Sequence, residues 1–264
     1  MQKRALEILI TNDDSYISNG IEVLTNILSN YGNITVIAPK GPQSAKGTSV
    51  SLHTNLYLEK ISEEKSANGH TIRRYFLSGT PVDCVKLALN KFFIDRYPDF
   101  LASGINHGSN ASAGAIYSGT LGAAKEATIY GIPAIGVSID EHSMDANLDA
   151  VKEILPTIID KFIASTELLK GSYLNVNFPN LPLSKIKGVK IAAQGKGKWI
   201  KEFQDKVDEN ERECLWMTGE YVDMADSPIS DHKLLKEGYI TVVPHKIDTT
   251  NYQILDSLQK EWNL

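Results

Sequence analysis

Hydrophobic and polar positions are arranged along the first two thirds of the chain in blocks that are typical of an α/β protein. An apolar run at residues 6–10 stops at a polar stretch, as a buried strand followed by a loop would. Apolar residues then recur at helical spacing over residues 20–30, and a second apolar run covers residues 34–38. This strand–helix–strand order predicts a mostly parallel sheet with helices on both faces.

The same alternation continues to residue 178. Further strands are expected at residues 50–59, 71–77, 100–103, 134–139 and 173–178. Further helices are expected at residues 81–93, 113–130 and 146–164. Open parallel sheets bind ligands at the carboxyl ends of their strands, so we look for functional residues in the loops that follow the predicted strands.

The pattern changes after Pro182, where strand-like segments alternate with charged connections. We therefore predict a main domain over residues 1–182, which carries the chemistry, and a C-terminal β-rich arm over residues 183–264. The arm has too little periodic apolar sequence for a core of its own. Several large side chains of the arm would be exposed on a monomer, so we expect a homodimer or a homotetramer. These side chains are Trp199, Phe203, Trp216, Met217 and Tyr221.

Composition narrows the class of protein. Hydrophobic residues make up 42% of the 264, which is enough for a sizeable core. The formal net charge is −5 and no basic tract occurs, which argues against a duplex nucleic-acid partner; we interpret the lysines of residues 185–201 as solvated. The two cysteines form neither a disulfide framework nor a zinc pattern. Because we find no signal peptide and no run of roughly 18 apolar residues, we expect a cytoplasmic protein without a membrane partner.

Two adjacent carboxylates, Asp13 and Asp14, follow the first predicted strand. Burying both without a cation would be costly, because like charges repel and each loses its hydration. Mg²⁺ or Mn²⁺ would relieve this repulsion, since these ions prefer carboxylate, amide and hydroxyl oxygens. The same residues are also typical of a solvated turn, and this loop alone leaves both interpretations open.

Two more loops follow predicted strands. One contains Ser44, and the other, over residues 103–110, is rich in glycine and asparagine. The second loop leads to Ser118, Gly119 and Thr120, near the beginning of a helix. Backbone N–H groups at a helix start, together with hydroxyl groups, can hold a phosphate. Tight packing of a helix on a sheet would require similar small residues, so this alternative stays open as well.

Several well-known catalytic and nucleotide-binding patterns do not occur. The first strand is not followed by G-x-G-x-x-G, and the chain has neither a Walker A sequence nor a G-x-S-x-G elbow. His107 lies in the candidate loop, but a single loop histidine is more often solvated than catalytic. The sequence therefore argues against a dinucleotide-binding fold and against a serine hydrolase.

Five short motifs occur together and in order. They are TNDD at residues 11–14, AP at 38–39 with Ser44, SGTPVDC at 78–84, SGIN at 103–106 with Gly108 and Asn110, and YSGT at 117–120. This set resembles the SurE (survival protein E) family of 5'-nucleotidases. NVNFP at residues 175–179 and Gly238–Tyr239 extend the likeness into the arm, so that it covers nearly the whole chain.

The resemblance implies a Rossmann-like fold, a C-terminal oligomerisation arm and one divalent metal ion, Mg²⁺ or Mn²⁺. The implied metal ligands are Asp13, Asp14, Ser44 and Asn106. The implied substrate-binding residues are Asn110, Ser118, Gly119 and Thr120. Asp13 and Asp14 are also the implied catalytic residues. The expected activity is the metal-dependent hydrolysis of nucleoside 5'-monophosphates to nucleoside and phosphate.

Two residues depart from the pattern of the family. Ser15 and Ser112 stand where the family usually has glycine, and glycine permits backbone angles that are costly for other residues. These two positions are the only support for an alternative function, that of a nucleotide-binding regulatory protein without turnover. All four implied ligand positions are nevertheless present.

Overall fold

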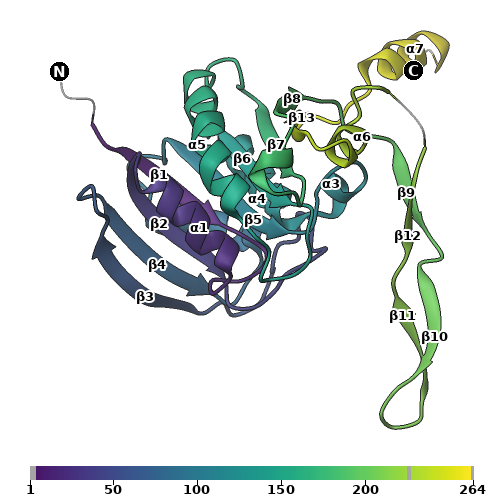
Figure 1. The fold of residues 1–264 in the computed structure, drawn as a ribbon, viewed down its shortest axis with the longest axis horizontal. Helices are drawn as coiled ribbons and strands as arrows, with labels where there is room; N and C mark the ends of the chain where they lie inside the picture. Colours follow the sequence, from purple (N-terminus) through teal and green to yellow (C-terminus); the bar gives the residue numbers. More distant parts are fainter. Residues whose placement is uncertain (1–3, 225–226, 263–264) are drawn as a thin grey trace.

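The computed structural model describes residues 4–224 and 227–262 and is built on a nine-stranded sheet (Figure 1). The strand order is β3-β4-β2-β1-β5-β6-β7-β13-β8. The strands are β1 (Leu6–Thr11), β2 (Gly32–Pro39), β3 (Leu58–Lys65), β4 (Thr71–Leu77), β5 (Phe100–His107), β6 (Ala134–Ile139), β7 (Ser172–Phe178), β8 (Val189–Ile191) and β13 (Ile240–Lys246). Only β3 and β13 pair antiparallel with their neighbours β4 and β7. The predicted mostly parallel sheet is therefore confirmed.

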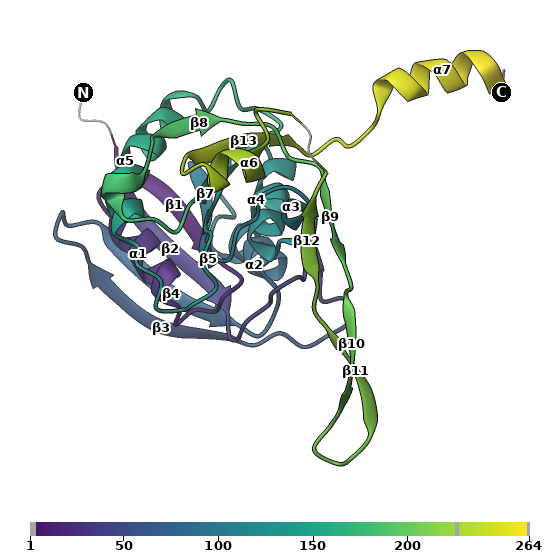
Figure 2. The same cartoon turned by 45° about the vertical axis from the view of Figure 1, so that its right-hand side comes forward.

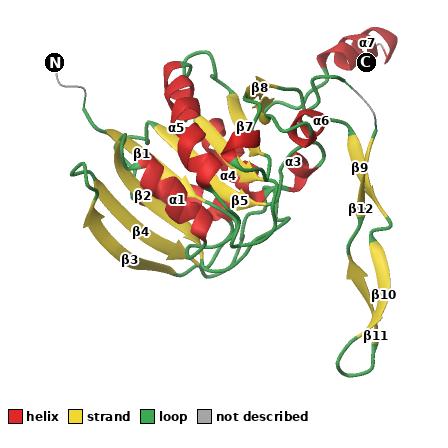
Figure 3. Ribbon diagram, viewed as in Figure 1, coloured by secondary structure: helices red, strands yellow, loops and turns green. Residues whose placement is uncertain are grey.

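Helices cover both faces of this sheet (Figure 3). The described helices are α1 (Asn19–Leu28), α2 (Pro81–Lys91), α3 (Gly114–Tyr117), α4 (Gly119–Ile129), α5 (Asp149–Ala164), α6 (Asp231–Lys236) and α7 (Tyr252–Trp262), of which α1 and α5 cover one face, α2 and α4 cover the other, and α7 projects away from the body. Ile8 and Ile10 of β1 pack in the cluster with α1 and α5, whereas Leu9 packs in the cluster with α2 and α4. Successive side chains of a strand point to opposite faces, which explains why β1 is apolar throughout.

Two predicted elements differ in the structure. The strand expected at residues 50–59 is wrong, because the strand begins only at Leu58 and the preceding segment is fastened to α2 instead. The N–H of Ser51 donates to Asp83 at 3.0 Å, and Thr80 donates to the carbonyl of Ser49 at 2.7 Å. The single helix expected at residues 113–130 is interrupted at Ser118, whose extended backbone and side-chain oxygen cap a new helix, α4.

The arm extends away from the body as a long two-stranded ribbon (Figures 1 and 2). Its strands are β9 (Gly197–Ile200), β10 (Phe203–Val207), β11 (Glu213–Met217) and β12 (Glu220–Asp223), which pair as β9 with β12 and β10 with β11. Both β8 and β13 return to the main sheet, so the extended ribbon is shorter than the predicted arm. A domain boundary near residue 182 stays a prediction. None of the described helices is both long and apolar enough to span a bilayer.

The topology explains where the predicted loops meet. From the central strand β1 the chain builds the sheet outward through β2 and β4 on one side, and through β5, β6 and β7 on the other. Such a reversal of strand order leaves a crevice at the carboxyl ends of the two central strands. Thr11 of β1 is in register with Ser103 of β5, so the loops after these strands lie side by side.

Ser15 and Ser112, where the resemblance leads us to expect glycine, both adopt positive φ, at 103° and 54° respectively. The Ser15 carbonyl accepts a hydrogen bond from Asn12 at 2.8 Å, which helps to hold the loop after β1 in this geometry. The chain therefore keeps the backbone angles that favour glycine while carrying a side chain, at a cost in strain.

We predict that Ser15→Gly raises the free energy of unfolding by about 1 kcal/mol, because glycine adopts the observed φ without steric cost. Urea unfolding followed by circular dichroism measures this change. Ser62→Gly in β3 is the control and lowers stability, since Ser62 has no positive φ and glycine weakens a strand. A loss of stability in Ser15→Gly would show that the loop is not strained.

Candidate active site

Asp13 lies two residues after the end of β1 and is almost fully buried. Its Oδ1 accepts a hydrogen bond from the hydroxyl of Thr120, and its main-chain oxygen accepts one from Gln43 at 2.7 Å. Burial raises the pKa of Asp13 to about 6; the hydrogen bond from Thr120 opposes this shift, and the charge of Asp14 adds to it. No Lys, Arg or His side chain in the described chain forms an ion pair with Asp13. Its negative charge is therefore not balanced by the protein.

Asp14 is held by His107, the last residue of β5. Oδ2 of Asp14 lies 2.9 Å from the backbone nitrogen of His107, which donates to it, and 2.9 Å from ring Nδ1. His107 is buried, so the expectation of a solvated histidine is wrong. A Cβ on Gly20 would lie only 3.2 Å from the His107 ring and 2.0 Å from the carbonyl oxygen of Ile105. A glycine in α1 thus lets this helix approach β5 and pack against the pair.

Ser44 and Asn106 bring neutral oxygens to the same place, because both line one cavity together with Asp13. Nδ2 of Asn106 donates to the carbonyl of Gly108 at 2.6 Å. This hydrogen bond fixes the amide and leaves its Oδ1 available as a ligand. The loop that carries Ser44 is fastened by the bond from Gln43 to Asp13 and by one from Gly47 to the carbonyl of Tyr117, at 2.9 Å.

Helix α4 begins directly against Asp13. Ser118 caps the helix, since its Oγ accepts from the N–H of Leu121 at 3.1 Å. A Cβ on Gly119 would lie 2.9 Å from Oδ2 of Asp13, so only glycine allows this close approach. Thr120 is fully buried and contacts the carboxylate. Ser118 lines the cavity, whereas Gly119 leaves room for the Asp13 carboxylate and Thr120 donates a hydrogen bond to it.

A chain of buried amides positions Asn110. Its backbone N–H donates to Asn177 at 2.8 Å, and its carbonyl accepts from Asn175 at 2.9 Å. Its side-chain Nδ2 donates to Ser138 at 2.8 Å. The supporting side chains are all fully buried, which makes the geometry of Asn110 precise. The NVNFP motif thus contributes residues of β7, two strands away from β5, that orient the candidate site.

The cavity has a volume of about 450 Å³. Five of the predicted residues line it, namely Asp13, Ser44, Asn106, Asn110 and Ser118. Tyr117 of the YSGT motif also lines it, and sequence reasoning missed other lining residues, among them His142, Trp199, Glu202 and Met217. Nothing in their spacing links these residues to the loops, because the last three come from the arm and reach the site only through folding.

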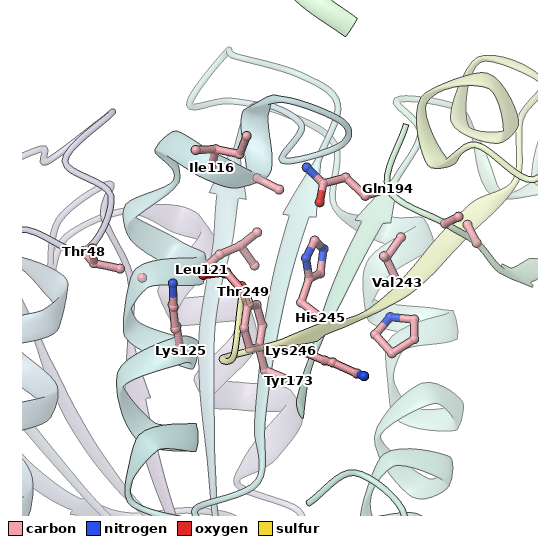
Figure 4. Close-up of a pocket in the computed structure, with 15 residues that line it drawn as sticks. Thr48, Ile116, Leu121, Lys125, Tyr173, Gln194, Val243, His245, Lys246 and Thr249 are labelled. Atoms are coloured by element: carbon pink, nitrogen blue, oxygen red, sulfur yellow. The ribbon is translucent and has the colours of Figure 1, made fainter. Parts of the chain in front are cut away.

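A larger cavity of about 740 Å³ contains none of the predicted residues (Figure 4). It is lined by residues of α3, α4 and β13, and its wall includes the stacked rings of Tyr173 and His245, with centroids 5.3 Å apart. The described residues that line it include Lys125 and Lys246 but no carboxylate. Size alone therefore does not identify the active site, whereas the grouping of carboxylates and polar oxygens around Asp13 does.

The residues around Asp13 suit a hard divalent cation. No group of three His, Cys, Asp or Glu side chains with metal-binding geometry occurs in the described part of the chain. The predicted set contains two carboxylates, one hydroxyl and one amide oxygen, and such a set leaves coordination positions for water and a phosphate oxygen, as Mg²⁺ and Mn²⁺ usually require. A buried carboxylate without a cationic partner fits the same ion.

Comparisons with known proteins agree with this geometry. Residues 8–201 match the family described as Survival protein SurE. A 5'-nucleotidase SurE from Christiangramia forsetii is 39% identical over 264 residues, covering 100% of this chain and 99% of the relative. One from Flavobacterium psychrophilum is 40% identical over 261 residues, covering 97% of each.

The fold shows the same relationship. The crystal structure of the SurE protein from Aquifex aeolicus matches with a TM-score of 0.79 and 30% identity, and the match covers 96% of this chain and 98% of that one. The similarity to these proteins thus extends over nearly the whole chain, from β1 to the arm. The chain belongs to the SurE family.

Proposed function

We propose that this protein is a metal-dependent 5'-nucleotidase, which hydrolyses nucleoside 5'-monophosphates to nucleoside and phosphate. The observation that carries this proposal is the buried, unbalanced carboxylate of Asp13 in a cavity lined by polar oxygens and by the start of α4. The names of the relatives support the same substrate class.

Asp13, Asp14, Ser44 and Asn106 would hold one Mg²⁺ or Mn²⁺ ion. Such an ion, when bound, polarises the phosphoryl group and lowers the pKa of a water molecule. Its charge would also balance that of Asp13, which the protein leaves uncompensated. His107 keeps Asp14 in position by occupying one of its carboxylate oxygens.

The chain itself binds the phosphate and moves the protons. Asn110 has one side-chain N–H left after its bond to Ser138, and Ser118 can donate its hydroxyl because its oxygen accepts from Leu121. Both would stabilise the charge that develops on the phosphoryl oxygens. Asp13 is better placed than Asp14 to orient the attacking water and take its proton, because Asp13 lines the cavity. The water oxygen bonds to phosphorus as its proton passes to Asp13, the ester P–O bond breaks, and the leaving nucleoside oxygen gains the proton that Asp13 took up.

The arm supports the proposal of a homodimer or homotetramer. Every residue of β10 and β11 is exposed, and no residue of α7 is buried. Leu215, Trp216, Ile254 and Trp262 expose between 53% and 66% of their surfaces, and exposed apolar groups of this kind mark interfaces. The cytoplasmic location expected from the sequence stays a prediction.

The activity is tested by phosphate release. We expect release from nucleoside 5'-monophosphates with Mn²⁺ or Mg²⁺, none with EDTA, and none at a comparable rate from a dinucleotide monophosphate. Polar oxygens line the cavity, and among the described residues no Lys or Arg lines it to bind the further phosphates of a polymer. Nucleotide binding without release under any metal condition would instead favour the regulatory alternative.

We predict that Asp13→Asn abolishes phosphate release and yet stabilises the metal-free protein. The folded-state pKa of Asp13, about 6, lies above its ordinary value of 3.8. The folded protein therefore binds more protons than the unfolded chain between pH 4 and pH 6, and wild type loses stability as pH rises through this window. The variant should be more stable by up to about 3 kcal/mol at pH 8, and the difference should disappear toward pH 4.

Urea unfolding in EDTA measures this difference, with Asp145→Asn, an exposed aspartate, as the control. Mn²⁺ should raise the melting temperature of wild type and leave that of Asp13→Asn nearly unchanged, because binding to the native state stabilises it by mass action. An equal loss of stability in Asp13→Asn at every pH would mean that the carboxylate is a structural acceptor only.

Assembly is tested by light scattering at micromolar concentration. We expect the mass of a dimer or a tetramer, and a shift to smaller species in Leu215→Asp, since this change places a charge on an exposed apolar position of β11. Asp205→Asn, at the position paired with Leu215 on β10, is the control and leaves the mass unchanged. A fully active monomeric wild type would refute the proposal.

A further inference from the structure

One wall of the active-site cavity comes from the arm. Trp199, Glu202, Met217 and Thr218 line the cavity from this side, although they lie far along the chain from the loops that carry the phosphate-binding residues. The N–H of Thr218 donates to the carbonyl of Glu202 at 2.8 Å, which joins the two strands of the ribbon at this level. The arm thus contributes side chains to the site in addition to its exposed strands.

Trp199 is held in place by contacts that lead back to the site. Its ring meets that of Tyr221 edge-on, with centroids 5.7 Å apart and an interplanar angle of 71°. The hydroxyl of Tyr221 donates to Oγ of Ser112, two residues beyond Asn110. The Tyr221 ring also packs on His232 at 4.5 Å. The position of the indole is therefore tied to the same loop that positions Asn110.

Asp231 strengthens this connection. Its carboxylate is fully buried and accepts hydrogen bonds from the N–H groups of Ser112, at 3.0 and 3.2 Å, and of Gly195, at 2.9 Å. One carboxylate thus joins the loop after β5 to the segment that leads into β9. Because Trp199 follows four residues after Gly195, its strand starts from a fixed point beside the site.

The chemistry of this wall fits a neutral aromatic group. Trp199 keeps 42% of its surface exposed, and Tyr117 and Met217, which also line the cavity, keep 57% and 67%. Within residues 4–224 and 227–262 no Lys or Arg side chain lines the cavity, while Glu202 adds a carboxylate. A second anionic group on the substrate would be repelled here, whereas a flat, uncharged ring could stack on the indole and contact the Met217 thioether.

We propose that Trp199 stacks against the base of the substrate and that the arm thereby selects nucleosides as leaving groups. This inference rests on the proposed function, because it concerns the alcohol released from the same phosphate. Stacking is available to every base, so Trp199 favours nucleotides over phosphomonoesters of non-aromatic alcohols without choosing strongly among bases. Trp199 acts through binding and moves no proton.

The test compares adenosine 5'-monophosphate with glycerol 3-phosphate, whose leaving group has no ring, as substrates in Mn²⁺. Trp199→Ala should raise KM for the nucleotide about tenfold or more and change kcat and the KM for glycerol 3-phosphate less than twofold. Trp199→Phe should restore most of the affinity. Trp216→Ala removes an exposed tryptophan that does not line the cavity, and it is the matched control.

Binding of adenosine, measured by titration calorimetry, gives a readout without turnover. Trp199→Ala should lose this binding at an unchanged mass in light scattering. Equal effects of Trp199→Ala on both substrates, or no effect on nucleotide KM and adenosine binding, would overturn the inference while leaving the proposed function intact. A wild type that binds adenosine through Trp199 but releases no phosphate would refute the proposed function alone.

Discussion

A carboxylate that is buried at the end of a strand needs hydrogen-bond donors or a cation, and among the described residues the carboxylate of Asp13 has the hydroxyl and backbone of Thr120 and its own backbone as donors, with no cationic partner. The raised pKa of Asp13, about 6, reflects the free-energy cost of burying its charged form. The surrounding residues are arranged to keep the carboxylate in this position: Gly119 makes room for it and Gln43 binds its main chain. The protein maintains a negative charge that a divalent cation would balance, and this requirement gives the site its chemistry.

The sheet brings the other groups to this charge. Because β1 lies between β2 and β5, the loops that follow these three parallel strands lie at one edge of the sheet. Ser44 comes from the loop after β2, and Asn106 and His107 from the end of β5. None of these residues is near Asp13 in sequence. The reversal of strand order at β1 and β5 makes them neighbours, as in other open α/β sheets.

The polar core behind the site extends toward the arm. Asn175 and Asn177 hold the backbone of Asn110, and Asp231 holds that of Ser112. Ser112, which has a positive φ, is thus bonded on its N–H to one buried carboxylate and on its side chain to Tyr221 of the ribbon. This arrangement shows how a residue with unfavourable φ can be kept, since tertiary hydrogen bonds compensate for the local strain. The geometry of the loop after β5 therefore depends on Tyr221 and Asp231, which lie in and next to the arm.

Local sequence was sufficient for the core of the fold. Apolar runs predicted β1, β2, β4, β6 and β7, and helical spacing predicted α1, α2 and α5. Strands buried between two layers of helices need apolar residues throughout, and helices that cover a sheet need an apolar face, so both patterns are visible in the sequence. The prediction for the edge strand β3 began too early, since residues 49–51 form hydrogen bonds with Asp83 of α2 and with Thr80, which caps that helix. The break at Ser118 depends on a single capping hydroxyl, which a run of small helix-forming residues conceals.

The motifs by themselves identified the family and the residues that gather around Asp13, since polar residues at strand ends must share one edge of a parallel sheet. What those residues do for one another was decided only by the tertiary structure. In the folded chain His107 is a buried hydrogen-bond partner of Asp14, and Thr120 donates to Asp13. Trp199 lines the cavity from the arm. Each of these contacts joins segments that are distant in the chain, and sequence patterns carry information about local periodicity and spacing but not about which distant side chains meet.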